Sequence, residues 1–378
     1  MEYIDQYFKR KTKEISFLEL KEEAQLVIKN KELKQVPLPI LTDKLIDDIK
    51  SNSLDEGVEL SRFVDGFIYT LGADPDFPYN KEYKKILLSL DSKVYGFVFT
   101  KAMEDYKSNR LDDSAIRLRG LLYIEPNNVD FLFNYGIVME EIGKRLIERD
   151  QLEEGEKFIK ISTDQFETIL DVDEEYSFAY YKLGFHYKYF ERYLKADLIW
   201  KKFLTLSKND LLKQEIREEL EKIKDDSSFE TGLTYLNYND YERALDSFLT
   251  LIPKHKESWN VNYLVGRCYS GLGQFNMAAD YLSKAIELND QEADLYNELG
   301  ILYFNIGNIN KALETFSQGI EKNIEDYKLF FNRGLAYVEL GQPKKGLKDI
   351  EKAYSLQPND ENIKRQKEHL ENILLDEK

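Results

Sequence analysis

The chain has 378 residues, and 53 lysine and arginine residues stand against 70 aspartate and glutamate residues, giving a formal net charge of −17. A nucleic-acid backbone would need a basic face, so this balance argues against nucleic acid as the main partner. It is compatible with a basic or neutral peptide partner, or with solubility alone. No stretch approaches the roughly 18 apolar residues of a membrane span, and the N-terminus has no secretory apolar core. With a single cysteine, we expect a cytoplasmic protein without membrane insertion.

Residues 1–94 have the least regular pattern. Apolar spacing between prolines predicts helices over Phe17–Lys31, Leu41–Ser51, Asp55–Leu71 and Asn80–Leu90. Gly66 and Tyr69 have a three-residue separation that recurs further along the chain. Three interpretations stay open for this helical N-terminal region. It contains a degenerate repeat near 59–94, it is a small helical cap with an accidental glycine, or it is a separate helical module with its own partner.

Residues 95–224 contain copies of a pattern that later becomes regular. One copy consists of Gly184, Tyr187, Ala196, Trp200 and Phe203. The intervals from Gly136 to Gly184 and from Gly184 to Gly232 are both 48 residues, which exceeds the later period of 34 by 14 residues. An addition of that length is about four helical turns, so the apolar face stays in register. We expect Lys144–Lys157 to lengthen a helix pair and Leu211–Lys224 to form an extra or extended helix.

Residues 225–360 have the most regular pattern. Gly232, Gly266, Gly300 and Gly334 are 34 residues apart, and a tyrosine follows each of them three residues later. Nine residues after each tyrosine stands a small residue, followed four residues later by a large apolar one. This register indicates a stacked array of one supersecondary unit. Apolar residues three and four apart predict two helices per repeat, with Gly307 ending the first helix of one copy. The small residues allow the paired helices to cross closely.

The chain resembles the tetratricopeptide repeat family at Tyr296, Leu299, Gly300, Tyr303, Ala312 and Phe316, and again at Pro358 in the last copy. The resemblance implies an all-α fold, a right-handed α-solenoid of helix-turn-helix hairpins. We expect seven repeats within 95–360, starting near residues 95, 129, 177, 225, 259, 293 and 327. Stacked repeats need polar caps at their ends, so we expect residues 361–378 to form a C-terminal capping helix.

In that family, the first helices of successive repeats line a concave groove. The resemblance therefore implies a peptide-binding groove lined by Tyr181, Phe185, Tyr189, Phe229, Tyr263, Arg267, Asn297, Phe304, Asn305, Lys328 and Phe331. Aromatic rings with interleaved amide and cationic groups suit an extended or helical peptide. The alternative for each residue is packing between neighbouring repeats, above all for Phe178 and Phe185.

The family's carboxylate clamp for chaperone C-termini is not expected. The matching positions hold Phe229, Leu233, Leu264, Asp294 and Glu298. The first three side chains cannot bind a carboxylate, and the two acidic ones would repel it.

The sequence offers no constellation for catalysis, so we expect no enzyme, no cofactor and no metal site. His186, His255 and His369 lie in separate segments and give no metal-ligand spacing. The stretch from Gly341 to Leu347 lacks the lysine that a phosphate loop needs directly after its second glycine. We expect Cys268 to be a buried small apolar residue rather than a reactive thiol.

Two functions of different class remain open. The favoured hypothesis is an intracellular adaptor whose groove holds a segment of a partner protein. The alternative is a peptide-sensing regulator in which the N-terminal region acts on a target and a bound peptide shifts the curvature of the solenoid. The regular 34-residue spacing weakens the alternative, and residues 1–94 show no helix-turn-helix signature.

Overall fold

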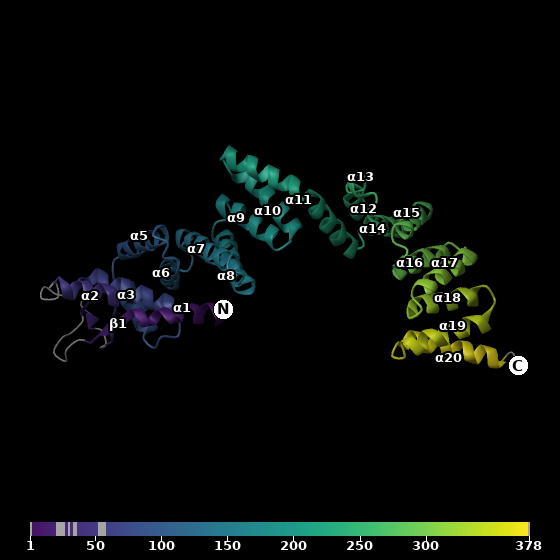
Figure 1. The fold of residues 1–378 in the computed structure, drawn as a ribbon, viewed down its shortest axis with the longest axis horizontal. Helices are drawn as coiled ribbons and strands as arrows, with labels where there is room; N and C mark the ends of the chain where they lie inside the picture. Colours follow the sequence, from purple (N-terminus) through teal and green to yellow (C-terminus); the bar gives the residue numbers. More distant parts are fainter. Residues whose placement is uncertain (1, 20–26, 29–30, 33–35, 52–57, 377–378) are drawn as a thin grey trace. The chain divides into compact units, whose positions relative to one another are not determined.

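A computed structural model describes residues 2–19, 27–28, 31–32, 36–51 and 58–376. The described chain is overwhelmingly helical (Figure 1), so the predicted all-α solenoid class is confirmed. The chain divides into two compact units, which we call unit 1 (Met1–Glu218) and unit 2 (Glu219–Lys378).

Unit 1 begins with a mixture of helices and short strands. The elements are α1 (Glu2–Lys9), η1 (Arg10–Glu14), β1 (Ile15–Leu18), β2 (Val27–Ile28), β3 (Lys31–Glu32), β4 (Leu38–Leu41), α2 (Thr42–Lys50), α3 (Leu60–Ala73) and α4 (Asn80–Ser89). The strands β1 and β4 pair antiparallel, as do β2 and β3. The helices expected over Leu41–Ser51 and Asn80–Leu90 are therefore present, with small differences at their ends.

The helix predicted over Phe17–Lys31 is wrong wherever the structure describes those residues. Phe17 and Leu18 belong to β1, and 27–28 and Lys31 also belong to strands, while the other positions lie outside the described residues or outside any helix. The reason is a tertiary contact between the sheet and α3. All four residues of β4 are buried, and a Cβ on Gly66 would stand 2.0 Å from the carbonyl oxygen of Pro39, so the strand lies directly on α3.

The helix predicted over Asp55–Leu71 is confirmed in part. Its described portion starts at Leu60 and continues to Ala73, while 55–57 lie outside the described residues. Because 58–59 are described and not helical, the helix begins later than the apolar spacing indicated.

The rest of unit 1 is built from helix pairs. They are α5 (Lys93–Lys107) with α6 (Leu111–Ile124), α7 (Val129–Ile147) with α8 (Leu152–Val172), and α9 (Ser177–Tyr189) with α10 (Tyr193–Leu206). The expected lengthening around Lys144–Lys157 is confirmed, because α7 and α8 have 19 and 21 residues. Leu211–Lys224 forms an extension of one continuous helix, α11 (Asp210–Asn237).

Unit 2 repeats one helix pair with little change. Its elements after α11 are α12 (Tyr241–Leu249), α13 (Ile252–His255), α14 (Trp259–Gly271), α15 (Phe275–Leu288), α16 (Ala293–Asn305), α17 (Ile309–Lys322), α18 (Tyr327–Glu339), α19 (Pro343–Leu356) and α20 (Glu361–Asp376). A Cβ on Gly300 would lie 2.3 Å from the Phe316 ring, which confirms the predicted close crossing. Gly307 has φ +80° just after α16, as expected for a residue that ends a helix.

Candidate functional site

Three aromatic side chains of α9 line an open hollow in unit 1. Tyr181, Phe185 and Tyr189 are four residues apart and therefore lie on one helix face. With Ile147 of α7 and Ile159 of α8 they border a hollow of about 410 Å³. The Phe185 ring meets the Tyr181 ring edge-on, with 5.1 Å between the ring centroids. This aromatic hollow provides apolar area from side chains that lose little conformational freedom when they bind a partner.

A buried carboxylate forms the polar part of the aromatic hollow. Glu140 of α7 accepts hydrogen bonds from Lys144 and, at 2.8 Å, from Lys182. The Nε2 atom of His186 lies 3.6 Å from the same carboxylate, and its Nδ1 atom lies 2.9 Å from the Thr163 hydroxyl. Burial raises the pKa of Glu140, but the imidazole and the two ammonium groups lower the pKa by more. The carboxylate therefore stays charged and holds both lysines at the edge of the hollow.

Hydrogen bonds between neighbouring helices fix the outer tyrosines of α9. The Tyr181 hydroxyl donates to Glu215 of α11 at 2.9 Å, and the Tyr189 hydroxyl donates to Glu156 of α8 at 3.4 Å. The bonded residues are 34 and 33 positions apart in the sequence. Tyr181 is thus tied to the first helix of the next repeat, and Tyr189 to the second helix of the preceding one.

In unit 2, α14 and α16 bring an aromatic ring, an arginine and two carboxylates together. The Arg267 guanidinium lies 5.7 Å from the centre of the Tyr263 ring. Burial and the charges of Glu298 and Asp294 raise the pKa of Tyr263. Burial also raises the pKa of Glu298, and Asp294 raises it further against the opposing effect of Arg267. The two carboxylates have two cationic neighbours, Arg267 and Lys328, so a cationic group from a partner would share them with these side chains.

The first helix of the next repeat, α18, continues this surface. The side-chain amide of Asn332 donates to the side-chain oxygen of Asn297 at 2.7 Å. The Lys328 ammonium lies 3.3 Å from the Asp294 carboxylate. Both contacts join α16 to α18, so the first helices of these two successive repeats are neighbours, as the family resemblance implied.

The structure divides the predicted site residues between the two units. Tyr181, Phe185 and Tyr189 belong to unit 1, and the others belong to unit 2. Within unit 2, Asn297 is buried, and Asn305 and Lys328 are exposed. The remaining residues are partly buried: Phe229, Tyr263, Arg267, Phe304 and Phe331. Phe229 packs edge-on against Phe248, with 5.9 Å between ring centroids.

Sequence reasoning missed the polar partners in both places. Glu140 and Glu215 line the aromatic hollow, and Asn332 is bonded to Asn297. The 34 residues between Tyr181 and Glu215 gave no signal, because the repeat interval at this place is 48 residues. No spacing marked Glu140 either, whose polar partners are Lys144 on its own helix and Lys182 and His186 on α9.

Three further expectations concern Cys268, metal binding and membrane-spanning helices. Cys268 is buried, and burial raises its pKa to about 11, so the predicted packing role is confirmed. Within the described ranges, His, Cys, Asp and Glu side chains form no group of three or more that could hold a metal ion. None of the described helices combines the length and apolar character needed to cross a membrane.

Comparison with known proteins identifies the repeat. Residues 260–292, 293–321 and 327–360 match a family model described as tetratricopeptide repeat. The repeats support a role in protein–protein interaction. A comparison with curated protein sequences gave no match.

Solved structures of repeat proteins resemble parts of the chain. MamA is 22% identical over 48% of this chain and 92% of its own, with a TM-score of 0.38. YrrB, described as a TPR protein with an unusual peptide-binding site, is 18% identical over 67% of this chain and 99% of its own, with a TM-score of 0.28. A thermophilic TPR protein of Thermus thermophilus is 17% identical over 51% of this chain and 98% of its own, with a TM-score of 0.35.

Proposed function

We propose that this chain, which belongs to the tetratricopeptide repeat family, is an adaptor that binds a peptide segment of a partner protein along the first helices of its repeats. Seven repeats, starting near residues 95, 129, 177, 225, 259, 293 and 327, make up the adaptor. A cytoplasmic setting is part of the proposal and is supported by the single, buried cysteine, since disulfides are common in secreted proteins.

The observation that carries the proposal is the aromatic hollow of unit 1. Tyr181, Phe185 and Tyr189 were selected from repeat position alone, and all three border the same hollow. A volume of about 410 Å³ is at the lower end of the range for small binding pockets and suits one large apolar side chain of a peptide. Packing between helices accounts for part of these rings, because Phe185 also lies edge-on against Trp200 at 5.0 Å.

The charged side chains on the surface of unit 2 indicate which charge the bound peptide should carry. Asp294 and Glu298 lie near Tyr263 on neighbouring helices, and their cationic neighbours are Arg267 and Lys328. A lysine or arginine of the peptide would compete with these two for the carboxylates, and the partial burial of Glu298 strengthens pairing there. A peptide that ends in a free carboxylate at this place is disfavoured for the same reason, so the chaperone clamp is not part of the proposal.

A peptide selection followed by binding measurements tests the proposal. Peptides are selected from a random library on the wild-type protein, and their affinities are then measured by fluorescence anisotropy. We expect selected peptides to combine an aromatic or large aliphatic residue with a basic one. Tyr189→Ala, which removes one wall of the aromatic hollow, should weaken binding about tenfold, as loss of an aromatic anchor does at interfaces.

Two further variants distinguish binding at unit 2 from binding at the aromatic hollow of unit 1. Tyr263→Ala/Arg267→Ala tests unit 2, and Tyr238→Ala is the matched control, because it removes an 80% exposed tyrosine that borders none of the described hollows. The proposal fails if selected peptides bind Tyr189→Ala and Tyr263→Ala/Arg267→Ala as tightly as they bind the control.

A further inference from the structure

A second hollow lies in unit 1 where η1 meets the start of α6 and the end of α7. It has a volume of about 490 Å³ and shares no lining residue with the aromatic hollow. Its lining includes five cationic side chains, Arg10, Lys11, Arg110, Arg145 and Arg149, against two carboxylates, Asp112 and Asp113. A local excess of positive charge in a chain of net charge −17 needs a specific explanation.

The carboxylate of Asp112 already has donors on both oxygens. The Tyr7 hydroxyl donates to one oxygen at 3.0 Å, and Arg10 donates to the other at 2.9 Å. The Arg10 guanidinium also stacks 3.9 Å from the centre of the Tyr7 ring. Burial and the charge of Asp112 raise the pKa of Tyr7 to about 12, so its hydroxyl keeps the proton that it donates. Asp112 thus orients Arg10 at the edge of the hollow.

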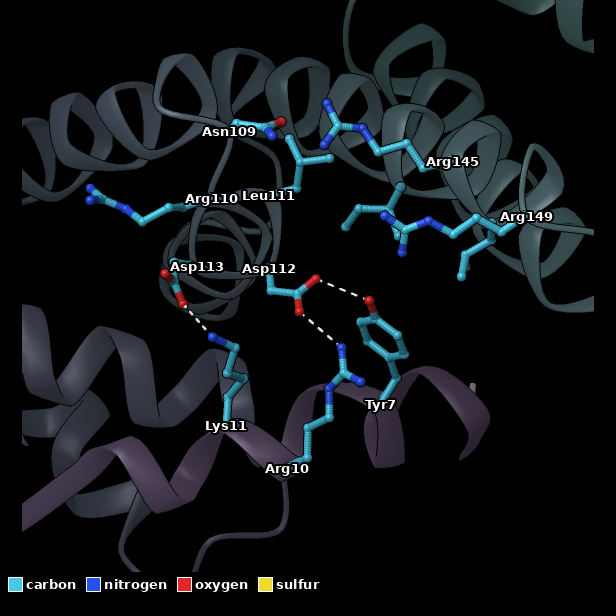
Figure 2. A pocket seen from close by; sticks show the side chains of 12 residues that line it. Tyr7, Arg10, Lys11, Asn109, Arg110, Leu111, Asp112, Asp113, Arg145 and Arg149 are labelled. Carbon is cyan, nitrogen blue, oxygen red and sulfur yellow. Dashed lines mark hydrogen bonds and ion pairs between the residues drawn. The ribbon is translucent and has the colours of Figure 1, made fainter. Parts of the chain in front are cut away.

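Asp113 accepts from both of its partners through one oxygen, Oδ1. Lys11 lies 3.2 Å from it, and the Tyr69 hydroxyl donates to it at 2.8 Å. The Arg110 side chain, which bonds to Asp105, extends away from Arg145 and Arg149 (Figure 2). Arg10, Arg145 and Arg149 border the rest of the hollow, and of these Arg10 pairs with Asp112 and Arg145 with Glu141.

Arg145 lies in the last turn of α7 and Arg149 in the turn that follows the helix, and both extend into the hollow toward the start of α6 (Figure 2). Arg145 uses Nε and Nη2 on a single oxygen of Glu141, at 3.0 and 2.9 Å. Arg149 has no ion pair with any part of the chain that the structure describes. Guanidinium groups that line one hollow repel each other, and an anion between them would remove that repulsion.

We propose that this hollow binds a phosphoryl group, held by Arg149 and Arg145 on one side and by Arg10 on the other. A phosphoryl group carries up to two negative charges and three acceptor oxygens, and guanidinium groups bind it through paired hydrogen bonds. Ile142 and Leu146, both buried, form part of the lining, and such apolar surroundings strengthen charge pairing. A small phosphorylated compound and a phosphorylated side chain of a partner present the same chemistry.

Calorimetric titration of the full chain in phosphate-free buffer at low salt tests the proposal. The probes are pyrophosphate, a phosphotyrosine peptide and the same peptide without phosphate. We expect one site per chain for at least one phosphorylated probe, with no binding of the unphosphorylated peptide. Arg149→Gln should weaken binding at least tenfold, Arg145→Gln/Arg149→Gln further still, and higher salt should weaken it too. Tighter binding of pyrophosphate assigns the site to small compounds, and tighter binding of the peptide assigns it to a phosphorylated partner.

Arg365→Gln is the matched control, because it removes the same charge from α20 in unit 2 and should leave binding unchanged. Arg149 is exposed, so its substitution should not unfold the protein, and circular dichroism of every variant checks this. The proposal is overturned if neither phosphorylated probe binds the wild-type chain, or if Arg149→Gln and Arg145→Gln/Arg149→Gln bind as tightly as Arg365→Gln.

Discussion

Unit 1 and unit 2 share one packing contact, but the N-terminal part of unit 1 adds another. In both units a glycine of the first helix of a pair lies against a large side chain of the second, as Gly184 does against Trp200 in unit 1. Gly300 lies against Phe316 and Gly334 against Ile350. In unit 1, α3 and α6 approach through their backbones. A Cβ on Gly120 of α6 would stand 1.9 Å from the carbonyl oxygen of Ile68 in α3.

Unit 1 also buries charge. The Arg117 guanidinium pairs with Asp65 at 2.8 Å and with Asp105, and all three side chains are nearly inaccessible to solvent. In unit 2, Arg333 pairs with Asp349 at side-chain exposures of 18% and 9%, and the pair of Lys322 with Asp290 is far more exposed. The difference teaches that a regular repeat is stabilised by interchangeable apolar contacts, whereas an irregular one depends on particular residues that cannot be exchanged.

The two tryptophans allow the units to be followed separately. Trp200 belongs to unit 1 and Trp259 to unit 2, and the chain has two tryptophans in all. Urea unfolding read by Trp200 in a Trp259→Phe background reports unit 1. Unfolding read by Trp259 in a Trp200→Phe background reports unit 2. Each stability prediction below is measured with the reporter of the unit that carries the change.

The largest effect is expected from Asp65→Ala in unit 1. It removes one of the two carboxylates that compensate the buried Arg117, so the free energy of unfolding should fall by about 4 kcal/mol. Asp290→Ala in unit 2 is the matched change on an exposed pair and should leave the unfolding midpoint nearly unchanged. Similar losses from the two substitutions would show that burial of charge does not distinguish the units.

Gly120→Ala should cost unit 1 about 3 kcal/mol, because the added methyl group meets backbone and α3 must move away from α6. Gly266→Ala in unit 2 should cost about 1 kcal/mol. There the added Cβ would lie 2.9 Å from Cγ of Leu282, which is a side chain that can rotate. An equal cost at both positions would contradict the proposed difference in packing.

The pH dependence of stability should have opposite signs in the two units. The pKa of Glu140 is lowered from 4.5, so its contribution in unit 1 is present above pH 4.5 and is lost as the pH falls. As the pH falls, the Glu140→Gln protein should therefore lose about 2 kcal/mol less of its free energy of unfolding than wild type loses. The pKa of Glu298 is raised, so its contribution in unit 2 is present below pH 4.5 and is lost as the pH rises.

Glu298→Gln should consequently gain stability relative to wild type as the pH rises from about 4 to about 7. Unfolding curves at several pH values check both variants. Two results would contradict these expectations. One is a Glu140→Gln protein whose free energy of unfolding falls as steeply in acid as that of wild type. The other is a Glu298→Gln protein that becomes less stable relative to wild type as the pH rises toward neutral.

The smallest effect concerns the turns inside the helix pairs. Glu191 has φ +54°, which is unfavourable for a residue with a side chain, while Gly307 has φ +80° at the corresponding turn of unit 2. Glu191→Gly should stabilise unit 1 by about 1 kcal/mol, and Gly307→Ala should destabilise unit 2 by about the same amount. A loss of stability in Glu191→Gly would show that its side chain compensates the strained backbone.

Much of unit 2 could be predicted from the spacing of its residues. The contact of Gly300 with Phe316, the turn at Gly307 and the burial of Cys268 all follow from positions within one repeat. Each contact joins residues close in sequence, so a periodic pattern is enough to place it. The same reasoning located Tyr181, Phe185 and Tyr189 on one face of α9.

The N-terminal part of unit 1 could not be predicted in this way. The residues Phe17 and Leu18 pair with β4, which lies against α3 at Gly66. The second hollow is assembled by Tyr7 and Asp112, which are 105 residues apart. Likewise, Glu140 meets Lys182 across 42 residues.

The sequence by itself determined the repeat, its helix pairs and the side chains on each helix face, because these depend on interactions over one or two turns and one hairpin. Tertiary structure alone decided where strands replace a helix, which charges are buried together and where hollows form. The physical reason is that long-range contacts are chosen by competition among many possible neighbours, and one sequence shows no trace of the alternatives that lost.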